Sequence, residues 1–301
     1  VNDKIIVAVS TYLSKYYSNE SSVHSSKLYQ YLMRRFIRFT YNHADLIVTI
    51  SEMSANDLNT NFGVDRKKLR VSYNPYEVDN IKAAASEPLG EYEALFSQNV
   101  IITLGRMYYV KAHWHLIRAF SNVHKRNPNA SLAILGSGEL EPYLKQLTHD
   151  LGLEQCVHFI GFQSNPFKFL KHSKCLILSS LNEGFPNVIA ESMACGTPII
   201  STDCRSGPRE MLAPDTDPRF ETKQIEKAKY GMLIPVCDGT QYDETTPLTK
   251  EELLMAHSMC EMLDNHELRA QYATRAQERI ADFDVEKIMA LWEGYIKSVL
   301  S

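Results

Sequence analysis

The sequence predicts an α/β protein of two domains, each built on a doubly wound sheet of parallel strands. Short runs rich in β-branched residues alternate with stretches of helical periodicity along most of the chain, which is the pattern of βα units. The length of 301 residues corresponds to about two domains of ordinary size. The hydrophobic fraction of 44% is sufficient to build a core in each of them.

The N-terminal part of the chain carries three strand signals and two helix signals. Leu28, Leu32, Phe36 and Phe39 recur every three or four residues, as on one face of a helix. Ser51 is a favourable N-cap for the next helix. The predicted strands are 4–9, 45–50 and 69–73, and the predicted helices are 26–42 and 51–62, the second of which ends at Gly63.

A change of composition after the third strand marks the expected domain boundary. Residues 76–98 are polar, contain an alanine run and a Glu-Pro pair, and give little strand or core signal. We therefore expect a partial N-terminal domain over 1–82, a linker over 83–98 and a second domain over 99–284. The last stretch, 285–301, is expected to form a helix that packs back on the first domain.

The second domain follows a regular order of strands and helices, whose ligands should bind at the carboxyl ends of the strands. Residues 213–229 are polar and rich in Pro and Asp, so we expect an exposed excursion there. The final helix carries a large apolar face, and we expect its Trp292 to be buried against the first domain. The predicted strands are 100–104, 130–135, 157–160, 175–179, 198–201 and 231–236, and the predicted helices are 112–126, 139–151, 166–172, 188–195, 250–265, 267–282 and 285–300.

Charge and cysteine content argue against several classes of function. There are 32 basic and 36 acidic residues, and a net charge of −4 offers no generally positive surface for nucleic acid. The six cysteines form no C-x-x-C pair, so we expect a reducing, cytoplasmic compartment rather than a zinc site or a disulfide framework. No apolar run is long enough to span a bilayer, and we expect no signal peptide in the given sequence. Because Val1 already lies in the approach to a strand, we expect residues upstream of it.

The segment 179–212 contains the most informative combination of residues. A strand ends there, a loop with Glu183 and Gly184 follows, and Pro186 and Asn187 open a helix, because proline is tolerated in a first helical turn. The free N–H groups at such a helix start, next to a glycine, favour the binding of a phosphate. The sequence therefore predicts an anion site at this turn.

Glu183 and Glu191 flank the predicted anion site. Carboxylates accept paired hydrogen bonds from vicinal diols, which sugars and riboses present. Taken alone, two glutamates at this spacing are most simply explained as a solvated loop residue and a helix-surface residue. The motifs around them favour the binding interpretation.

Residues 100–212 closely resemble the nucleotide-sugar-binding domain of the retaining GT-B glycosyltransferases of family 4. That family has a glutamate, a glycine-containing turn and a second glutamate eight residues on, followed by a Gly-x-Pro strand. It also has a Gly-Arg pair and a lysine after the first strand of this domain, and a Gly-x-Gly turn. The matching residues are Glu183, Gly184, Glu191, Gly196 and Pro198 in the first motif, Gly105, Arg106 and Lys111 in the second, and Gly136 and Gly138 in the third.

The resemblance implies a GT-B fold of two Rossmann-like domains, the first of them incomplete in this chain, and it implies roles for individual residues. Arg106 and Lys111 would neutralise the diphosphate leaving group, and Glu183 would hold hydroxyls of the transferred sugar; these three are the catalytic candidates. Glu191 would bind the ribose of the donor. The donor-binding candidates are Gly105, Gly136, Gly138, Phe162, Gly184, Phe185, Pro186, Asn187 and Glu191.

The same resemblance implies the reaction. A nucleoside-diphosphate sugar, which we expect to be UDP-linked, would donate a hexosyl or N-acetylhexosaminyl group to a glycan or lipid-linked acceptor, with retention of configuration and without an obligatory metal or other cofactor. We assign no Mg²⁺ or Mn²⁺ site to any Asp-x-Asp run or His/Asp cluster of the sequence. Many family members have a histidine at the end of the strand predicted over 4–9, where this chain has Val9, Ser10 and Thr11.

The first predicted helix offers a contact to the inner face of an anionic membrane. Its basic residues alternate with aromatic and aliphatic ones, although packing on the sheet with a solvated basic edge is the alternative. Two other functions stay open, a nucleotide-sugar epimerase of related architecture and a donor-binding fragment without activity. The basic residues concerned are Lys27, Arg34, Arg35 and Arg38.

Overall fold

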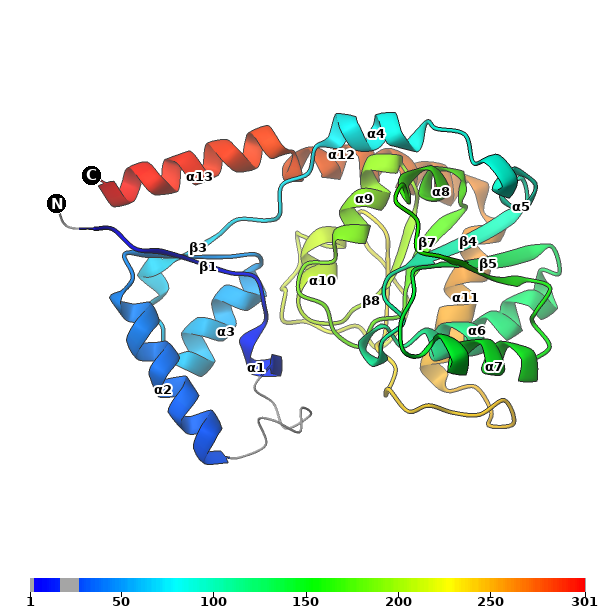
Figure 1. Cartoon of the computed structure of the whole chain (residues 1–301), viewed down its shortest axis with the longest axis horizontal. Helices are drawn as coiled ribbons and strands as arrows, with labels where there is room; N and C mark the ends of the chain where they lie inside the picture. Colours follow the sequence, from blue (N-terminus) through cyan, green and yellow to red (C-terminus); the bar gives the residue numbers. More distant parts are fainter. Residues whose placement is uncertain (1–2, 17–26, 301) are drawn as a thin grey trace.

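The structure, a computed structural model, describes residues 3–16 and 27–300, which form two sheets in two domains (Figure 1). In the first domain the described strands are parallel and lie in the order β1-β2-β3. Helices α2 and α3 lie on one side of this sheet (Figure 1). The elements are β1 (Ile6–Val9), α1 (Leu13–Tyr16), α2 (Lys27–His43), β2 (Leu46–Thr49), α3 (Glu52–Phe62) and β3 (Leu69–Val71).

The second domain has, among the described residues, a seven-stranded sheet in the order β6-β5-β4-β7-β8-β10-β9. Neighbouring strands are parallel except β9, which runs antiparallel to β10. The order reverses between β4 and β7, and sheets of this kind bind ligands beyond the carboxyl ends of the strands at that point. The strands are β4 (Asn99–Leu104), β5 (Ala130–Leu135), β6 (Val157–Gly161), β7 (Cys175–Leu178), β8 (Ile199–Thr202), β9 (Glu226–Lys227) and β10 (Met232–Ile234).

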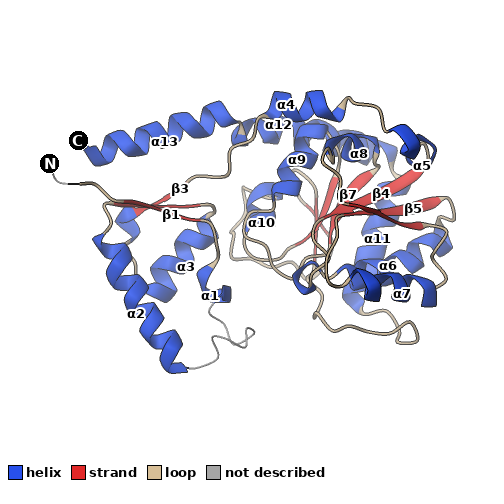
Figure 2. Cartoon of the chain, viewed as in Figure 1, coloured by secondary structure: helices blue, strands red, loops and turns tan. Residues whose placement is uncertain are grey.

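Helices cover both faces of the second sheet (Figure 2). On β4, Ile101 packs into the core shared with α6, whereas Val100 and Ile102 pack into the core shared with α8 and α9. Successive side chains of a strand point to opposite faces, so a strand covered on both faces is apolar throughout. The helices are α4 (Val78–Ala85), α5 (Glu93–Phe96), α6 (His113–Arg126), α7 (Glu141–Asp150), α8 (Phe167–His172), α9 (Asn187–Cys195), α10 (Gly207–Leu212), α11 (Lys250–Asp264), α12 (His266–Ile280) and α13 (Val285–Leu300).

The strands and helices predicted from periodicity are found within two residues of their predicted ends. Ser51 caps α3 as predicted, since its side chain accepts a hydrogen bond from the backbone N–H of Ser54. Gly63 ends the same helix in a left-handed conformation with φ of 68°. The local signals of cap and stop therefore correctly define this helix.

The sequence predicts a linker with little core over 83–98, and this prediction is wrong because the segment packs into a core. The segment contains the end of α4 and all of α5, and Leu89 and Phe96 are buried in a core of the second domain. On α4, Val78 and Ile81 are one helical turn apart and pack into the same core. The segment is polar on average, so its few apolar residues at helical spacing did not give a core signal in the sequence.

The predicted exposed excursion over 213–229 is partly wrong as well. Its strand β9 pairs with β10, and Glu226 of that strand binds the guanidinium of Arg209 on α10, a helix that was not predicted. Arg209 is buried and also binds Asp203 with a separation of 3.0 Å between Nε and Oδ1. A buried arginine requires such partners, and they hold the segment against the sheet.

Helix α13 leaves the second domain and runs along the first, on the side opposite α2 and α3 (Figure 1). The hydroxyl of Tyr295 donates to the carbonyl of Val71 on β3 at 2.8 Å, so the crossing to the first domain is as predicted. The burial of Trp292 is not: this residue is half-buried, and Ile288 is the buried residue of the helix. Leu291 and Ile296 stay exposed because the helix meets the first domain near β3 along one side only.

Across residues 3–16 and 27–300, none of the helices combines enough length with enough apolar character to cross a membrane.

Candidate active site

Two loops meet at the reversal point of the second sheet. The loop after β4 contains Arg106 and Lys111, and the loop after β7 contains Glu183. Backbone and side-chain hydrogen bonds join them, from the N–H of Leu181 to the carbonyl of Val110 at 2.8 Å and from the hydroxyl of Ser179 to the carbonyl of Lys111 at 2.8 Å. The predicted catalytic candidates therefore come from adjacent loops at the carboxyl edge of the sheet.

Lys111 and Glu183 form an ion pair across these loops, with 2.5 Å between Nζ and Oε1. The same carboxylate oxygen accepts a hydrogen bond from the hydroxyl of Ser180 at 2.7 Å. The side chains are 25% and 13% exposed, so both charged groups are partly desolvated but can be reached by a ligand. Arg106 is exposed on the same loop, with its guanidinium 5.7 Å from the ring centre of Tyr108.

The predicted glycines bring the loops after β4 and β5 together backbone to backbone. A Cβ atom on Gly136 would lie 2.1 Å from the carbonyl oxygen of Gly105, and one on Gly138 would lie 2.6 Å from that of Met107. Gly105 has a φ of 150°, which side-chain-bearing residues rarely adopt. Since the amide of Met107 also donates to the carbonyl of Ser137 at 3.0 Å, the turn that carries Arg106 is fixed by this packing.

The turn that leads into α9 faces the first domain. A Cβ on Gly184 would lie 3.5 Å from the carbonyl oxygen of Ser10, and Pro186 stands at the N-cap position of the helix. The side-chain oxygen of Asn187 accepts hydrogen bonds from Asn74 at 2.9 Å and from Tyr76 at 2.7 Å. Of the predicted donor-binding residues, Asn187 therefore has its side-chain oxygen engaged at the domain junction.

Three further predicted donor-binding residues lie in different environments. Phe185 is buried, stacked on Tyr73 with 5.0 Å between ring centres and edge-on to Phe283, so only its backbone is available to a ligand. Phe162 is 79% exposed beyond β6. Glu191 lies on α9, and burial raises the pKa of its carboxyl group.

A cleft of about 650 Å³ separates the two domains beside the loop that carries Glu183. Tyr12, Ser14 and Arg34 line it from the first domain, and Asn182 and Arg205 line it from the second. The lining also includes Glu221, whose carboxylate pairs with Arg205 at 2.8 Å, so this is a polar cleft with side chains of both charges. Within the parts of the chain that are described, no group of three or more metal-ligating side chains is found.

Sequence reasoning missed the polar contact that joins the two domains. The carboxylate of Glu210 on α10 accepts hydrogen bonds from the backbone N–H groups of Glu52 at 2.8 Å and Met53 at 2.9 Å, at the start of α3 in the other domain. Next to it, the hydroxyls of Ser51 and Ser206 lie 3.1 Å apart. A signal was present, because an acid at a helix start is favourable, but its partner helix begins 158 residues earlier.

Glu210 is an unusual carboxyl group. Burial raises its pKa to about 7, although the hydrogen bonds from Met53 and Glu52 oppose the shift. Tyr73 also lies close, with its hydroxyl 3.4 Å from Oε2, and burial raises the pKa of this phenol as well. The domain junction thus contains a group that titrates near neutral pH.

The fold and this site together define the chain as a protein of the GT-B glycosyltransferase class. Anabaena HepE, solved in complex with UDP, superposes with a TM-score of 0.76 at 20% identity, over 98% of this chain and 72% of that one. WaaG, a glycosyltransferase involved in lipopolysaccharide biosynthesis, superposes with a TM-score of 0.68 at 15% identity, over 94% of this chain and 72% of that one. Likeness at this level of identity concerns the fold, and it confirms the predicted GT-B architecture.

Sequence comparison then shows the family. The model of the glycosyl transferases group 1 matches residues 93–229, and that of glycosyltransferase family 4 matches residues 6–80. An uncharacterized glycosyltransferase of Methanocaldococcus jannaschii is 35% identical, over 94% of this chain and 71% of its own length. The chain belongs to the family 4 glycosyltransferases, as its motifs predict.

A second relative bears a specific name. The N-acetylgalactosamine-N,N'-diacetylbacillosaminyl-diphospho-undecaprenol 4-alpha-N-acetylgalactosaminyltransferase of Campylobacter jejuni is 31% identical, over 85% of this chain. The chain spans 61% of the length of that relative.

The titration of Glu210 gives a prediction for Glu210→Gln. In the unfolded chain this carboxyl group releases its proton near pH 4.5, whereas the folded protein holds it until about pH 7. Its contribution to stability is complete below pH 4.5 and is lost as the pH rises to about 7, by on the order of 1 kcal/mol per pH unit. Urea unfolding at pH 5, 6 and 7 should show this decline in the wild type and a smaller one in the variant.

The exposed Glu278 on α12 provides the matched control. Glu278→Gln should keep the pH dependence of the wild type. Equal slopes for Glu210→Gln and the wild type would contradict the assignment of a near-neutral carboxyl to the domain junction.

Proposed function

We propose that the protein transfers a sugar from a nucleoside-diphosphate donor, UDP-linked and carrying a hexosyl or N-acetylhexosaminyl group, to a hydroxyl of a glycan or lipid-linked acceptor, with retention of configuration. The observation that carries this proposal is the contact of Lys111 with Glu183 at the reversal point of the sheet, beside the start of α9. The bound UDP in HepE and the diphospho-undecaprenol in the name of the Campylobacter relative support the same donor and acceptor classes.

The cations of the site would act on the leaving group. As the bond between the sugar and the diphosphate breaks, negative charge grows on the diphosphate oxygens. Lys111 is held at its place by Glu183, and Arg106 projects from the same loop, so both positive charges are in position before that charge develops. Charges oriented in advance stabilise a developing anion more than mobile ones do.

The two glutamates would bind hydroxyl groups of the donor. Glu183 already accepts two hydrogen bonds from protein groups, and a sugar hydroxyl would take a place on the same carboxylate. Glu191 lies on α9, where burial makes its carboxylate a stronger acceptor for the diol of the ribose. The cleft beside Glu183 would admit the acceptor between the two domains.

We also propose that this chemistry needs no metal ion and no other cofactor. Support comes from Arg106 and Lys111, whose two positive charges would do for the diphosphate what a divalent cation does elsewhere.

Peripheral contact with the inner face of a membrane is a further part of the proposal, and α2 supports it. Only Ile37 of this helix is buried, whereas Leu32, Phe36 and Phe39 are more than half exposed. The basic residues between them would attract anionic lipid headgroups. A helix of this composition lies favourably in the interface of an anionic membrane.

Donor binding can be measured by calorimetry with UDP. Arg106→Ala removes a charge that faces the diphosphate, and Glu191→Ala removes the partner of the ribose, so each variant should bind UDP about tenfold more weakly or worse. Turnover of the UDP-sugar should fall about a hundredfold in Arg106→Ala, because the lost interaction acts on the developing charge.

Arg219→Ala is the matched control. It removes an exposed arginine that is not among the proposed donor-binding residues, so this variant should bind UDP as the wild type does. Unchanged affinity in both test variants would contradict the proposed donor site. A sugar epimer formed in the absence of acceptor would instead indicate an epimerase.

Chelation tests the metal-free part of the proposal. After exhaustive treatment with EDTA, the rate of sugar transfer should stay within a factor of two of the untreated rate, because protein cations carry the diphosphate charge. The rate is measured by release of UDP. Loss of the activity with recovery on addition of Mn²⁺ would refute it.

Vesicle sedimentation tests the membrane contact. The double variant Phe36→Ser, Phe39→Ser should bind vesicles of anionic lipid severalfold more weakly than the wild type, because two exposed aromatic side chains no longer enter the interface. Leu253→Ser, which changes an exposed apolar residue of α11, is the control and should leave binding unchanged. Absence of wild-type binding, or equal loss in both variants, would argue against this role of α2.

A further inference from the structure

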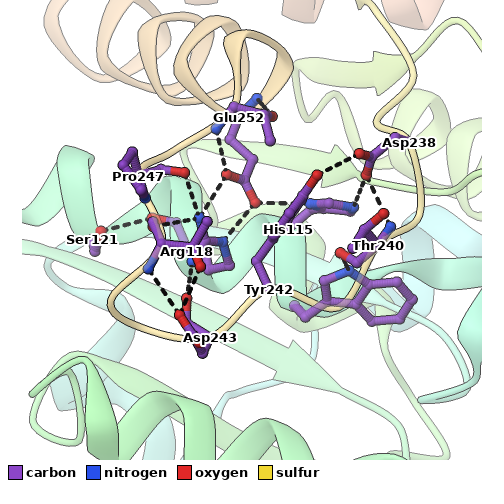
Figure 3. Close-up of polar contacts among 12 residues, drawn as sticks. His115, Arg118, Ser121, Asp238, Thr240, Tyr242, Asp243, Pro247 and Glu252 are labelled. Atoms are coloured by element: carbon purple, nitrogen blue, oxygen red, sulfur yellow. Dashed lines mark hydrogen bonds and ion pairs between the residues drawn. The ribbon is translucent and has the colours of Figure 1, made fainter.

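A buried cluster of charged residues joins α6 to α11 and to the segment that precedes α11 (Figure 3). Arg118 and Glu252 are 1% and 0% exposed, and they are joined by 2.8 Å between Nε and Oε1. His115 lies 2.8 Å from the same carboxylate oxygen through Nδ1. None of these residues has a role in the proposed transfer of sugar, and burial of such charges is costly.

Arg118 holds a segment without regular structure, residues 238–249. Its Nη2 atom donates to the carbonyls of Thr246 at 3.0 Å and Pro247 at 3.1 Å, and Nη1 donates to that of Asp243. Glu252 completes the attachment, because its carboxylate accepts the N–H of Thr249 at 2.9 Å. One arginine therefore fixes several backbone carbonyls of a segment that itself forms neither a strand nor a helix (Figure 3).

The segment in turn holds the turn that carries Lys111. The hydroxyl of Tyr109 donates to the carbonyl of Gly239 at 2.9 Å, and the indole N–H of Trp114 donates to that of Thr240 at 3.0 Å. Tyr109 and Trp114 flank Lys111 in the chain, and their rings lie 5.2 Å apart. A side chain at position 239 would clash with the hydroxyl of Tyr109, at 2.8 Å from its Cβ, so the approach of the segment is close.

The turn itself is strained. Ala112 directly follows Lys111 and has a φ of 47°, and it is the one residue other than glycine with positive φ in the described chain. An alanine in this conformation persists only where neighbouring contacts hold it there. The bonds of Tyr109 and Trp114 on either side of it are contacts of that kind.

We propose that Arg118 is a positioning residue for Lys111: it fixes the segment 238–249, whose carbonyls hold Tyr109 and Trp114, and thereby keeps the strained turn that directs Lys111 at Glu183. This inference rests on the proposed function of Lys111 for its catalytic consequence. The structural part of the inference, that the conformation of the turn depends on the segment, follows from the contacts alone.

Tyr109→Phe is the most specific test, because it removes one hydroxyl and its bond to Gly239 while the ring stays. Hydrogen exchange of the amides at 111 and 112 should become about tenfold faster, and kcat/KM for the UDP-sugar should fall about tenfold, since small displacements of a catalytic group are costly. The melting temperature should change little. Arg118→Lys, which lacks the guanidinium fork that reaches the carbonyls of Asp243, Thr246 and Pro247 together, should give the same changes in exchange and kcat/KM. Tyr272→Phe, at a buried tyrosine on α12, should give neither effect.

A double-mutant cycle with Lys111→Met shows whether the effect passes through Lys111. In the Lys111→Met background, Tyr109→Phe should produce no further loss of kcat/KM, because the group that it positions is absent. Unchanged exchange at 111 and 112 in Tyr109→Phe, or an equal loss of kcat/KM in both backgrounds, would overturn the inference. If exchange is accelerated but Lys111→Met itself retains full activity, the proposed function of Lys111 fails while the dependence of the turn on the segment holds.

Discussion

The candidate site depends on the hydrogen bonds between two loops at the point where the strand order reverses. Val110 and Lys111 offer their carbonyls to Leu181 and Ser179, and these bonds bring a lysine and a glutamate 72 residues apart into contact. The ion pair of Lys111 with Glu183 is partly shielded from water, so its two charges stabilise each other more than they would on an open surface. In the proposed reaction, a diphosphate leaving group would be stabilised by a cation that is already oriented.

The same loop couples the site to the other domain. Phe185, two residues after Glu183, is packed between Tyr73 and Phe283, which lie at the two places where the chain passes between the domains. These passages are bonded to each other, since Tyr76 pairs with Asp284 as an isolated bridge. Glu210 adds its carboxylate to the start of α3. A rotation of the domains about these passages would therefore move the loop that carries Glu183.

Sequence reasoning succeeds here where the signal is local. Most strands and helices of the second domain follow from periodicity, although α5, α10 and β9 were not predicted. The ends of α3 follow from Ser51 and Gly63, because cap and stop act within one turn. The motifs place Lys111 and Glu183 on neighbouring loops, but their direct contact requires the strand order. The contact of Glu210 was missed because its partner is the start of a helix in the other domain, and local sequence does not indicate which distant helix an acid will cap.

The contacts of the buried charges of Arg118 and Glu252 are also not predictable from local sequence signals. A buried ion pair contributes little net stability compared with well-packed apolar residues, since desolvation offsets most of the attraction. Such a pair is useful where one geometry must be selected, and an arginine that bonds to several carbonyls selects the path of a whole segment. The strained conformation of Ala112 needs support of this kind, because the local sequence favours other conformations there. Specificity of backbone geometry, rather than stability, is therefore the physical reason for burying these charges.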